Sequence, residues 1–295
     1  MASLKETALA CLERILTPDP QVFLFGTLIV LLVPVLLHFL VVRSSPYTSP
    51  PTILLTGPSG AGKTALATKL ERGAPAATHT SQRAHATELT SPSSAASRAS
   101  LEKALSDTDS KHTKFLLLDV PGHGKLRSEA LGRLAPAALA DAKAKGVVFV
   151  VDAAALADAE ALSAAASYLY DVLLALQRRT AGIKTSKIPA AIPVLVAANK
   201  GDLFTALPAA LVRSTLEAEL GRVRASRSKG LLDSGVGIDE VGSEEADAWL
   251  GAYGTEKFDF GQMREFNVDV EVVGGNVLGE GVGVDKWWKW IADKI

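Results

Sequence analysis

The chain has 295 residues, a formal net charge of −1 at pH 7 and 48% hydrophobic residues. A balanced charge supplies no basic surface for a polynucleotide, so direct nucleic-acid binding is not expected. Cys11 is the one cysteine, which excludes a disulfide within the chain. The length and apolar content suit one globular domain, residues 52–295, together with a shorter N-terminal part.

The first strong feature is an apolar segment, residues 22–42, which contains no formally charged residue. As an α-helix it would be about 31 Å long, which matches the hydrocarbon core of a bilayer. A cleaved signal peptide and a buried core helix are the alternatives. A signal peptide normally has a shorter apolar region that ends in small residues, whereas this one runs into Arg43. The sequence therefore predicts one transmembrane anchor, with a short segment before it, 1–21, and a linker after it, 43–51.

The octapeptide GPSGAGKT, residues 57–64, follows the strand-like apolar run 53–55 and precedes a helix-compatible stretch. This order is typical of a phosphate-binding loop, and a chance glycine-rich turn is the alternative. Lys63 supplies positive charge, the Thr64 hydroxyl can bind Mg²⁺, and the N-terminus of the following helix adds its dipole. The residues predicted to contact the nucleotide here are Gly57, Ser59, Gly60, Ala61, Gly62, Lys63 and Thr64.

The phosphate-binding loop also sets the expected orientation in the membrane. Lys5 and Arg14 precede the apolar segment and Arg43 follows it, so the distribution of positive charge is nearly uninformative. A phosphate-binding domain needs the nucleotide and Mg²⁺ of the cytosol. We therefore expect a cytosolic domain, with residues 1–21 across the membrane.

Beyond the loop, short apolar runs alternate with helix-compatible segments. This alternation predicts an α/β fold with a mostly parallel central sheet flanked by helices. Two polar segments, 91–112 and 224–247, do not fit the alternation and are predicted to be mobile insertions. The expected strands are 53–55, 115–118, 147–151, 194–198 and 268–273, and the expected helices are 126–145, 155–177, 209–223 and 284–295.

The tetrapeptide DVPG, residues 119–122, directly follows an expected strand, where functional residues collect in open α/β sheets. Asp119 can hold Mg²⁺ through a water molecule, and the Gly122 N–H can contact a γ-phosphate. In hydrolytic proteins of this kind the next residue orients the attacking water. That residue is His123, which is therefore the candidate catalytic residue.

The tetrapeptide NKGD, residues 199–202, also ends an expected strand. The Asp202 carboxylate can accept hydrogen bonds from guanine N1–H and N2–H₂, whereas adenine presents an acceptor there, which predicts roughly 10⁴-fold selectivity. Asn199 would brace the base edge, and the Lys200 stem would cover the ring face. Alone, this motif also fits an ordinary turn. Behind the two earlier motifs, it predicts a GTP-binding protein with Mg²⁺ as cofactor.

The C-terminal run 284–295 places apolar side chains at helical spacing with lysines between them. A closing helix packed on the sheet is favoured over a tryptophan-bearing face at the membrane surface. Of its side chains, Trp290 is expected to be the one least needed for packing and most available for another role.

The three nucleotide motifs, the strand pattern and the apolar segment together resemble the β-subunit family of the signal recognition particle receptor, membrane-anchored relatives of the Arf and Sar GTPases. The similarity extends over nearly the whole chain. The other segments that are similar to this family are THTS at 78–81, DVPGHGKLR at 119–127, VVFVVDAAA at 147–155, SYLYDVLL at 167–174 and LEAELGRVRASRS at 216–228.

This resemblance implies a P-loop GTPase fold that binds GTP and Mg²⁺. Thr80 matches the threonine that completes the Mg²⁺ shell when GTP is bound, and Thr78 is the less favoured choice. The family also implies a single-pass protein of the endoplasmic reticulum membrane with a cytosolic GTPase domain. The implied partner is the N-terminal domain of the receptor α subunit, in co-translational protein targeting, and the ribosome and translocon are further candidates.

Two features set this chain apart from many GTPases. The guanine-contacting loop near the C-terminus, which reads SAK in many relatives, matches residues 273–276 best, so Gly274 and Gly275 are the candidate contacts. His123 stands where many GTPases have Gln, and a neutral imidazole cannot both donate and accept at one edge as an amide does. We therefore predict slow hydrolysis, with GTP as a long-lived ligand. The alternatives are a cycling Arf/Sar-like GTPase of vesicle traffic and a scaffold with a vestigial pocket.

Overall fold

The computed structural model describes residues 20–44, 50–91, 113–181, 191–233, 249–251, 257–279, 281 and 283–295. It divides into two compact units, Met1–Ser49 and Pro50–Ile295. Nearly all of the predicted segment 1–21, much of the linker 43–51, and residues 92–112 of the first predicted insertion lie outside the described residues.

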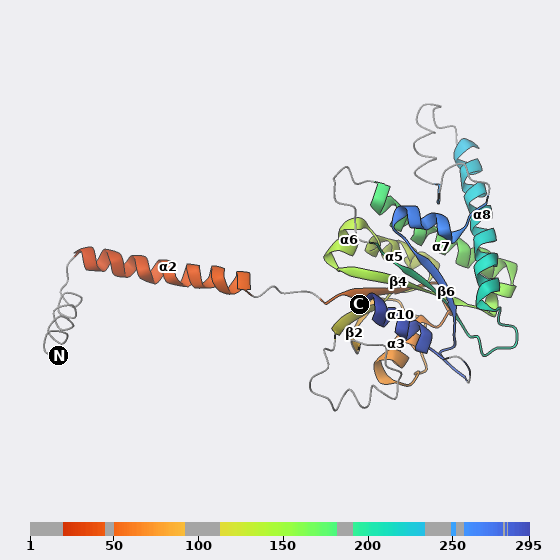
Figure 1. Cartoon of the computed structure of the whole chain (residues 1–295), viewed down its shortest axis with the longest axis horizontal. Helices are drawn as coiled ribbons and strands as arrows, with labels where there is room; N and C mark the ends of the chain where they lie inside the picture. Colours follow the sequence, from red (N-terminus) through yellow and green to blue (C-terminus); the bar gives the residue numbers. More distant parts are fainter. Residues whose placement is uncertain are drawn as a thin grey trace. The chain divides into compact units, whose positions relative to one another are not determined.

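The first unit contains helix α2, Pro20–Ser44, which includes the predicted transmembrane segment (Figure 1). Its large apolar side chains are exposed, as Phe23 at 67% and Val30 at 70% illustrate. By length and composition, one helix of the described residues could cross a membrane, Ala159–Thr180, but 50% of that stretch is buried inside the second unit; α2 holds a shorter apolar stretch, Phe23–Phe39. The longer stretch is therefore a core helix, and the anchor in α2 stays a prediction.

The second unit is built on a six-stranded sheet of order β2-β3-β1-β4-β5-β6 (Figure 1). All neighbouring strands described in it are parallel except β2 and β3. The predicted α/β fold with a mostly parallel sheet is confirmed. Strand β2 was not predicted because its sequence, HATELTS, is mostly polar. The bounds are β1 Thr52–Thr56, β2 His85–Ser91, β3 Thr113–Asp119, β4 Ala144–Asp152, β5 Val194–Asn199 and β6 Val270–Gly274.

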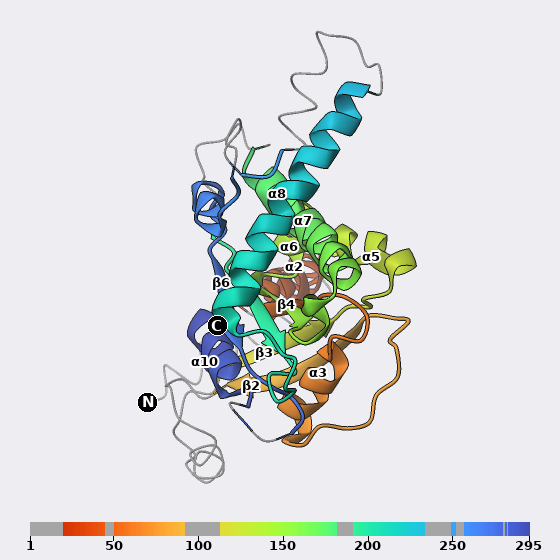
Figure 2. The ribbon, with the colours of Figure 1, turned by 90° about the vertical axis from the view of Figure 1, so that its right-hand side faces the viewer.

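Helices cover both faces of the sheet (Figures 1 and 2). The central strands are apolar at consecutive positions, so alternate side chains enter different cores. Leu54 and Phe149 face the core formed with α7 and α8, whereas Leu55 and Val150 face the core formed with α3 and α10. The helices are α3 Lys63–Arg72, α5 Arg127–Arg133, α6 Pro136–Asp141, α7 Ala159–Ala181, α8 Ala209–Asp233 and α10 Asp285–Lys294, and the 3₁₀ helices are η1 Gly124–Leu126, η2 Ala155–Ala157 and η3 Phe260–Phe266.

Two predicted boundaries are wrong. The expected helix 126–145 is divided, because Pro136 starts α6 and cannot continue α5, and strand β4 already begins at Ala144. The predicted insertion 224–247 is helical over its first ten residues, since α8 continues to Asp233. Arg224 explains this extension: it is buried, donates from Nη1 to the Leu250 carbonyl at 3.2 Å, and lies 4.5 Å over the Trp249 ring. Residues 234–248 lie outside the described part.

Helix α10 packs on the sheet through Trp287, Trp290 and Ile291, which confirms the favoured interpretation of the C-terminal run. The expectation that Trp290 is available for a role other than packing is wrong, because this side chain is only 6% exposed. Its ring lies against Gly146 of β4, where an added Cβ would approach it to 3.2 Å. Trp288 is the half-buried tryptophan of this helix.

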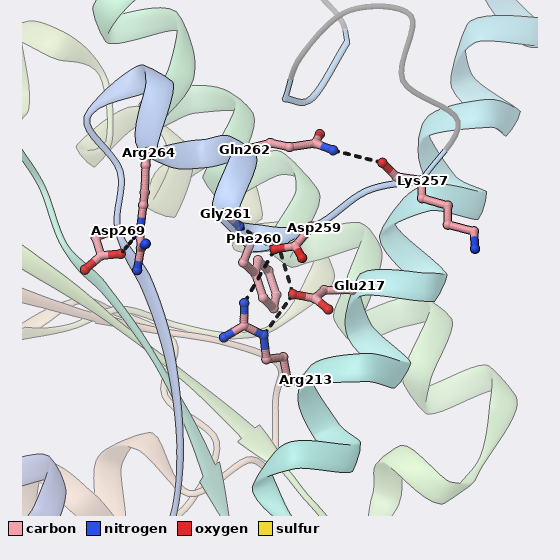
Figure 3. A network of polar contacts seen from close by, with 9 residues as sticks. All are labelled: Arg213, Glu217, Lys257, Asp259, Phe260, Gly261, Gln262, Arg264 and Asp269. Carbon is pink, nitrogen blue, oxygen red and sulfur yellow. Dashed lines mark hydrogen bonds and ion pairs between the residues drawn. The ribbon is translucent and has the colours of Figure 1, made fainter.

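Polar contacts fasten the segment before β6 to helix α8 (Figure 3). The Glu217 carboxylate accepts hydrogen bonds from Arg213 Nε at 3.0 Å and from the Phe260 N–H at 3.2 Å. Asp259 accepts from the Gly261 N–H at 2.6 Å and so caps η3. These contacts hold the chain where it enters β6, whose far end leads into the functional site.

Candidate functional site

The predicted motifs meet at the carboxyl ends of the parallel strands. Residues 57–64 follow β1, Asp119 ends β3, and Asn199 ends β5. Leu55 is in register with Asp119, and Asp152 at the end of β4 is in register with Asn199. The order of the strands therefore brings the three motifs to one edge of the sheet, as in open α/β folds that bind nucleotides.

Glycines of the phosphate-binding loop occupy conformations and spaces that exclude a side chain. Gly57 has φ 137°, and an added Cβ would lie 2.2 Å from the Val150 carbonyl oxygen. Gly62 has φ 94°, and its Cβ would lie 2.3 Å from Asn199 Nδ2. Both positions thus require glycine for conformational and for steric reasons.

Lys63, the first residue of α3, is buried behind the loop. Its Nζ donates to the carbonyl oxygens of Gly57 at 2.9 Å and Pro58 at 2.7 Å. Burial lowers the pKa of Lys63 to about 8, and the nearby Asp119 carboxylate opposes that shift. The ammonium is thus fixed beside the loop, where an anion would stabilise its charged form.

The Thr64 hydroxyl donates to Asp119 Oδ2 at 2.6 Å and lies 2.8 Å from Ser81 Oγ. Asp119 Oδ1 is buried and has no hydrogen-bond partner among the described residues. Burial raises the pKa of the Asp119 carboxyl, and the Thr64 hydrogen bond and the charges of Lys63 and His85 oppose this. Hydroxyl and carboxylate oxygens with an unused lone pair are the donors that Mg²⁺ prefers, so this cluster fits the metal.

The sequence predicts Thr80 as the hydroxyl that completes the Mg²⁺ shell and does not predict Ser81. In the structure Thr80 and Thr78 are exposed, whereas Ser81 is half-buried against Thr64. The hydroxyl that contacts Thr64 is therefore one residue later in the chain than the one that the sequence predicts.

Gly122 lies against the phosphate-binding loop. An added Cβ would come within 2.4 Å of both the Gly57 carbonyl oxygen and Lys63 Nζ. The next residue, His123, is exposed, and its Nδ1 accepts a hydrogen bond from the Lys125 N–H at 3.3 Å. An imidazole held in this way has its remaining proton on Nε2, so the other edge of the neutral ring is a donor.

Asn199 joins the two ends of the site. Its Nδ2 donates to the Ala61 carbonyl at 2.8 Å, and its Oδ1 accepts from the Val277 N–H at 3.0 Å. The side chain is 3% exposed, so either lost bond would leave a buried polar group unpaired. Asn199 therefore holds the loop after β6 in place relative to the phosphate-binding loop.

Lys200 has φ 64°, and its Nζ pairs with Asp152 Oδ2 at 2.5 Å. Asp152 also accepts from the N–H groups of Ala154 and Ala155 through Oδ1, at 3.0 and 3.1 Å. This carboxylate was missed by the sequence analysis, although an Asp directly after an apolar strand was a usable signal. It fixes the position of the Lys200 stem, which the sequence assigned to the face of the base.

Gly275, which the sequence predicts to contact the base, lies beside the NKGD motif, where its carbonyl accepts from the Gly201 N–H at 3.1 Å. The Gly275 N–H donates to the Ala198 carbonyl at 2.9 Å, so it is already used within the fold. The backbone next to Asp202 is instead that of Gly279, where an added Cβ would lie 2.7 Å from Asp202 Oδ2. Gly279 has φ 74°, which was not recognisable from the sequence match to residues 273–276.

Comparisons with known proteins point to one family. A family model described as the signal recognition particle receptor beta subunit matches residues 48–268. Signal recognition particle receptor subunit beta of Saccharomyces cerevisiae is 29% identical over 246 residues, which cover 83% of this chain and 84% of the yeast protein. The Mus musculus subunit is 32% identical over 189 residues, which cover 62% of this chain and 60% of the mouse protein.

Solved structures from Chaetomium thermophilum are similar as well. The signal recognition particle receptor SRb-GTP/SRX complex has 42% identity and a TM-score of 0.69, and the match covers 83% of this chain and 100% of that chain. The SRb-GDP-Mg structure has 44% identity and a TM-score of 0.62, and the match covers 84% of this chain and 100% of that chain.

Proposed function

The chain belongs to the signal recognition particle receptor beta subunit family, and from this we propose that it binds GTP with Mg²⁺ and recruits the receptor α subunit to the endoplasmic reticulum membrane for co-translational protein targeting. The observation that carries this proposal is the convergence of the three nucleotide motifs at one edge of the sheet. The related structures with GTP and SRX, and with GDP and Mg, support both ligands and a partner.

At the phosphate end, the backbone of residues 57–64 and the Lys63 ammonium would hold the phosphates. Lys63 exchanges its two carbonyl acceptors for phosphate oxygens, which are charged and therefore stronger acceptors. Thr64 and Asp119 would hold Mg²⁺, which neutralises phosphate charge. Gly122 lies just after β3, the strand that ends with Asp119. Its N–H is the donor proposed for the γ-phosphate.

A further hydroxyl would complete the metal site. The sequence match assigns it to Thr80, whereas Ser81 is the hydroxyl in contact with Thr64. We assign this role to Ser81, because it already lies at the Thr64 hydroxyl without any rearrangement of the segment.

At the base end, Asp202 would accept from guanine N1–H and N2–H₂, and the Lys200 stem, held by Asp152, would cover the ring. The donor to guanine O6 is proposed to be a backbone N–H near Gly279, since this is the backbone next to Asp202. Gly274 and Gly275 then support the base end by spacing β6 from β5, without contacting the base.

Hydrolysis by the chain alone is proposed to be slow. His123 is exposed and its Nδ1 accepts from the Lys125 N–H, so the free edge of the neutral ring donates and does not accept. A residue that orients an attacking water must accept one of its protons. This favours a receptor subunit that keeps GTP over a protein that cycles rapidly in vesicle traffic.

Helix α2 is the proposed anchor. It has 25 residues, which as an α-helix would be about 37 Å long and would cross a hydrocarbon core of about 30 Å. Its exposed apolar side chains suit a lipid environment, where they need no protein partner. The compact unit Pro50–Ile295 would then lie in the cytosol, where GTP and Mg²⁺ are available.

Recruitment of the partner can be tested with the full chain in detergent, loaded with Mg²⁺ and either a non-hydrolysable GTP analogue or GDP. Calorimetry would measure the Kd of each form for the N-terminal domain of the α subunit. We expect the GTP form to bind at least about tenfold more tightly, a difference of about 1.4 kcal/mol. Equal affinities would contradict nucleotide-dependent recruitment, and failure to load either nucleotide would contradict the nucleotide site itself.

A further inference from the structure

Helix α7 carries two fully buried tyrosines, Tyr168 and Tyr170, within the segment SYLYDVLL. Two residues apart on a helix, they point in roughly opposite directions. Helix α7 lies between α5 and α8 (Figure 2). The two side chains therefore face different neighbours, and the nucleotide motifs described above use neither of them.

Tyr168 faces the nucleotide site. Its hydroxyl lies 2.7 Å from Thr56 Oγ1, and Thr56, itself fully buried, is the last residue of β1, directly before Gly57. Burial raises the pKa of Tyr168, so the phenol remains a neutral hydrogen-bonding group. One side chain of α7 thus holds the residue from which the phosphate-binding loop starts.

The ring of Tyr168 supports a second part of the site. Arg127, the first residue of α5, has its guanidinium carbon 4.7 Å from the ring centroid, and its Nη2 donates to the Ala164 carbonyl at 3.4 Å. Phe149 of β4 packs edge-on against the same ring at 5.5 Å. Because Arg127 ends the segment that begins with Asp119, the ring positions the helix that follows Gly122 and His123.

Tyr170 makes the same types of contact on the other side of α7. Arg227 of α8 lies 4.4 Å over its ring and pairs with Asp171 Oδ1 at 2.7 Å. Its hydroxyl makes a hydrogen bond with the backbone of Leu250. Tyr170 therefore joins α7 to α8 and to residues 249–251, away from the phosphate-binding loop, which makes it a matched control for Tyr168.

We propose that Tyr168 is a positioning residue of the nucleotide site, whose hydroxyl fixes the start of the phosphate-binding loop through Thr56 while its ring seats Arg127 at the start of α5. This inference rests on the proposed nucleotide binding. It assigns to α7 the task of keeping the phosphate-binding loop and the segment 119–127 in one arrangement, so that nucleotide release requires both to move.

The test compares Tyr168→Phe with Tyr170→Phe in the full chain. Each variant loses one buried hydroxyl and keeps the ring that faces an arginine. Release of fluorescently labelled GDP in the presence of Mg²⁺, and the Tm of each variant, would be measured. We expect comparable decreases in Tm but about tenfold faster release from Tyr168→Phe alone, as the loss of one buried hydrogen bond allows.

Thr56→Val removes the other partner of the same hydrogen bond. It keeps the test decisive if Tyr168→Phe does not fold. It should accelerate release by a similar factor, and the double variant should be no faster than either single one. Release at the wild-type rate from both single variants, or equal acceleration by Tyr170→Phe, would overturn this inference alone. A wild-type chain that takes up no labelled guanine nucleotide would overturn the proposed function and this inference together.

Discussion

The phosphate end and the base end of the site are built in different ways. At the phosphate end, the loop and Lys63 belong to one continuous segment, and Lys63 bonds to carbonyls five and six residues before it. At the base end, three separate parts of the chain contribute: Asp152 ends β4, and Asp202 and Gly279 lie in the segments after β5 and β6. The first arrangement is mostly local, whereas the second depends on the register of three strands.

This difference has a physical consequence. A local loop keeps its shape as long as its glycines and its helix are present, whereas the base end also requires that β6 and its following loop stay attached. Asn199 is the link, since it bonds to Ala61 on one side and to Val277 on the other. Damage to the phosphate end should therefore affect every nucleotide alike, and damage to the base end should change which base is preferred.

The largest effect is expected for Asp202→Asn. An amide presents a donor where the carboxylate accepts, so the preference for guanine over xanthine nucleotides should invert, with a swing on the order of 10⁴-fold. Competition binding of GTP and XTP, with Mg²⁺ present, would measure it. Unchanged guanine preference would show that another group recognises the base.

Lys63→Ala should weaken all nucleotides together. Loss of the charge-assisted bonds to phosphate is expected to lower the affinity for GDP and GTP by about 100-fold, without altering base preference. Calorimetry with both nucleotides is the measurement. Lys289→Ala, an exposed lysine of α10, is the control and should bind as wild type does. A changed ratio of guanine to xanthine binding in Lys63→Ala would remove the distinction between the two ends.

A smaller effect separates the two candidate base loops. Gly279→Ala places a Cβ 2.7 Å from Asp202 Oδ2 at φ 74°, so GTP affinity should fall. A non-glycine residue in the left-handed conformation raises the conformational free energy of the loop by roughly 1–2 kcal/mol. This corresponds to a decrease in GTP affinity of about tenfold. In Gly274→Ala the new Cβ would lie 3.5 Å from Ala209 Cβ, an ordinary contact, and affinity should hardly change. The reverse order of effects would restore Gly274 as the base contact.

The smallest effect concerns the metal. Ser81→Ala should raise the Mg²⁺ concentration that half-maximally slows release of a labelled GTP analogue, by about threefold to tenfold, because one neutral hydrogen-bonding group is lost. Thr80→Ala should leave this concentration unchanged. If instead Thr80→Ala raises it and Ser81→Ala does not, the assignment from the sequence match is the correct one.

Much of the phosphate end could be predicted because the loop and Lys63 are adjacent in the sequence and its glycines are required by conformation and by close contacts. The structure places Lys63, Thr64, Asp119 and Gly122 together as the motifs implied. The position of Gly279 beside Asp202 could not be predicted in this way, since it depends on a positive φ and on the register of β6 beside β5.

Other differences between expectation and structure have equally specific causes. In the extension of α8, Arg224 contacts Trp249, 25 positions later, and Arg227 contacts Asp171 of α7, so composition alone suggested a loop. The choice between Thr80 and Ser81 depends on which of two neighbouring hydroxyls points inward, and hydropathy does not reveal it. In each case a long-range contact decided what local sequence left open.

The most direct test is the identity of the nucleotide that the full chain retains when it is purified with the N-terminal domain of the α subunit. Chromatography of the released nucleotide would identify the base and the number of phosphates. We predict GTP in near-stoichiometric amount, because Asp202 is the proposed guanine acceptor and hydrolysis with His123 in the water-orienting position is proposed to be slow. An adenine nucleotide, or GDP in place of GTP in the complex, would contradict this.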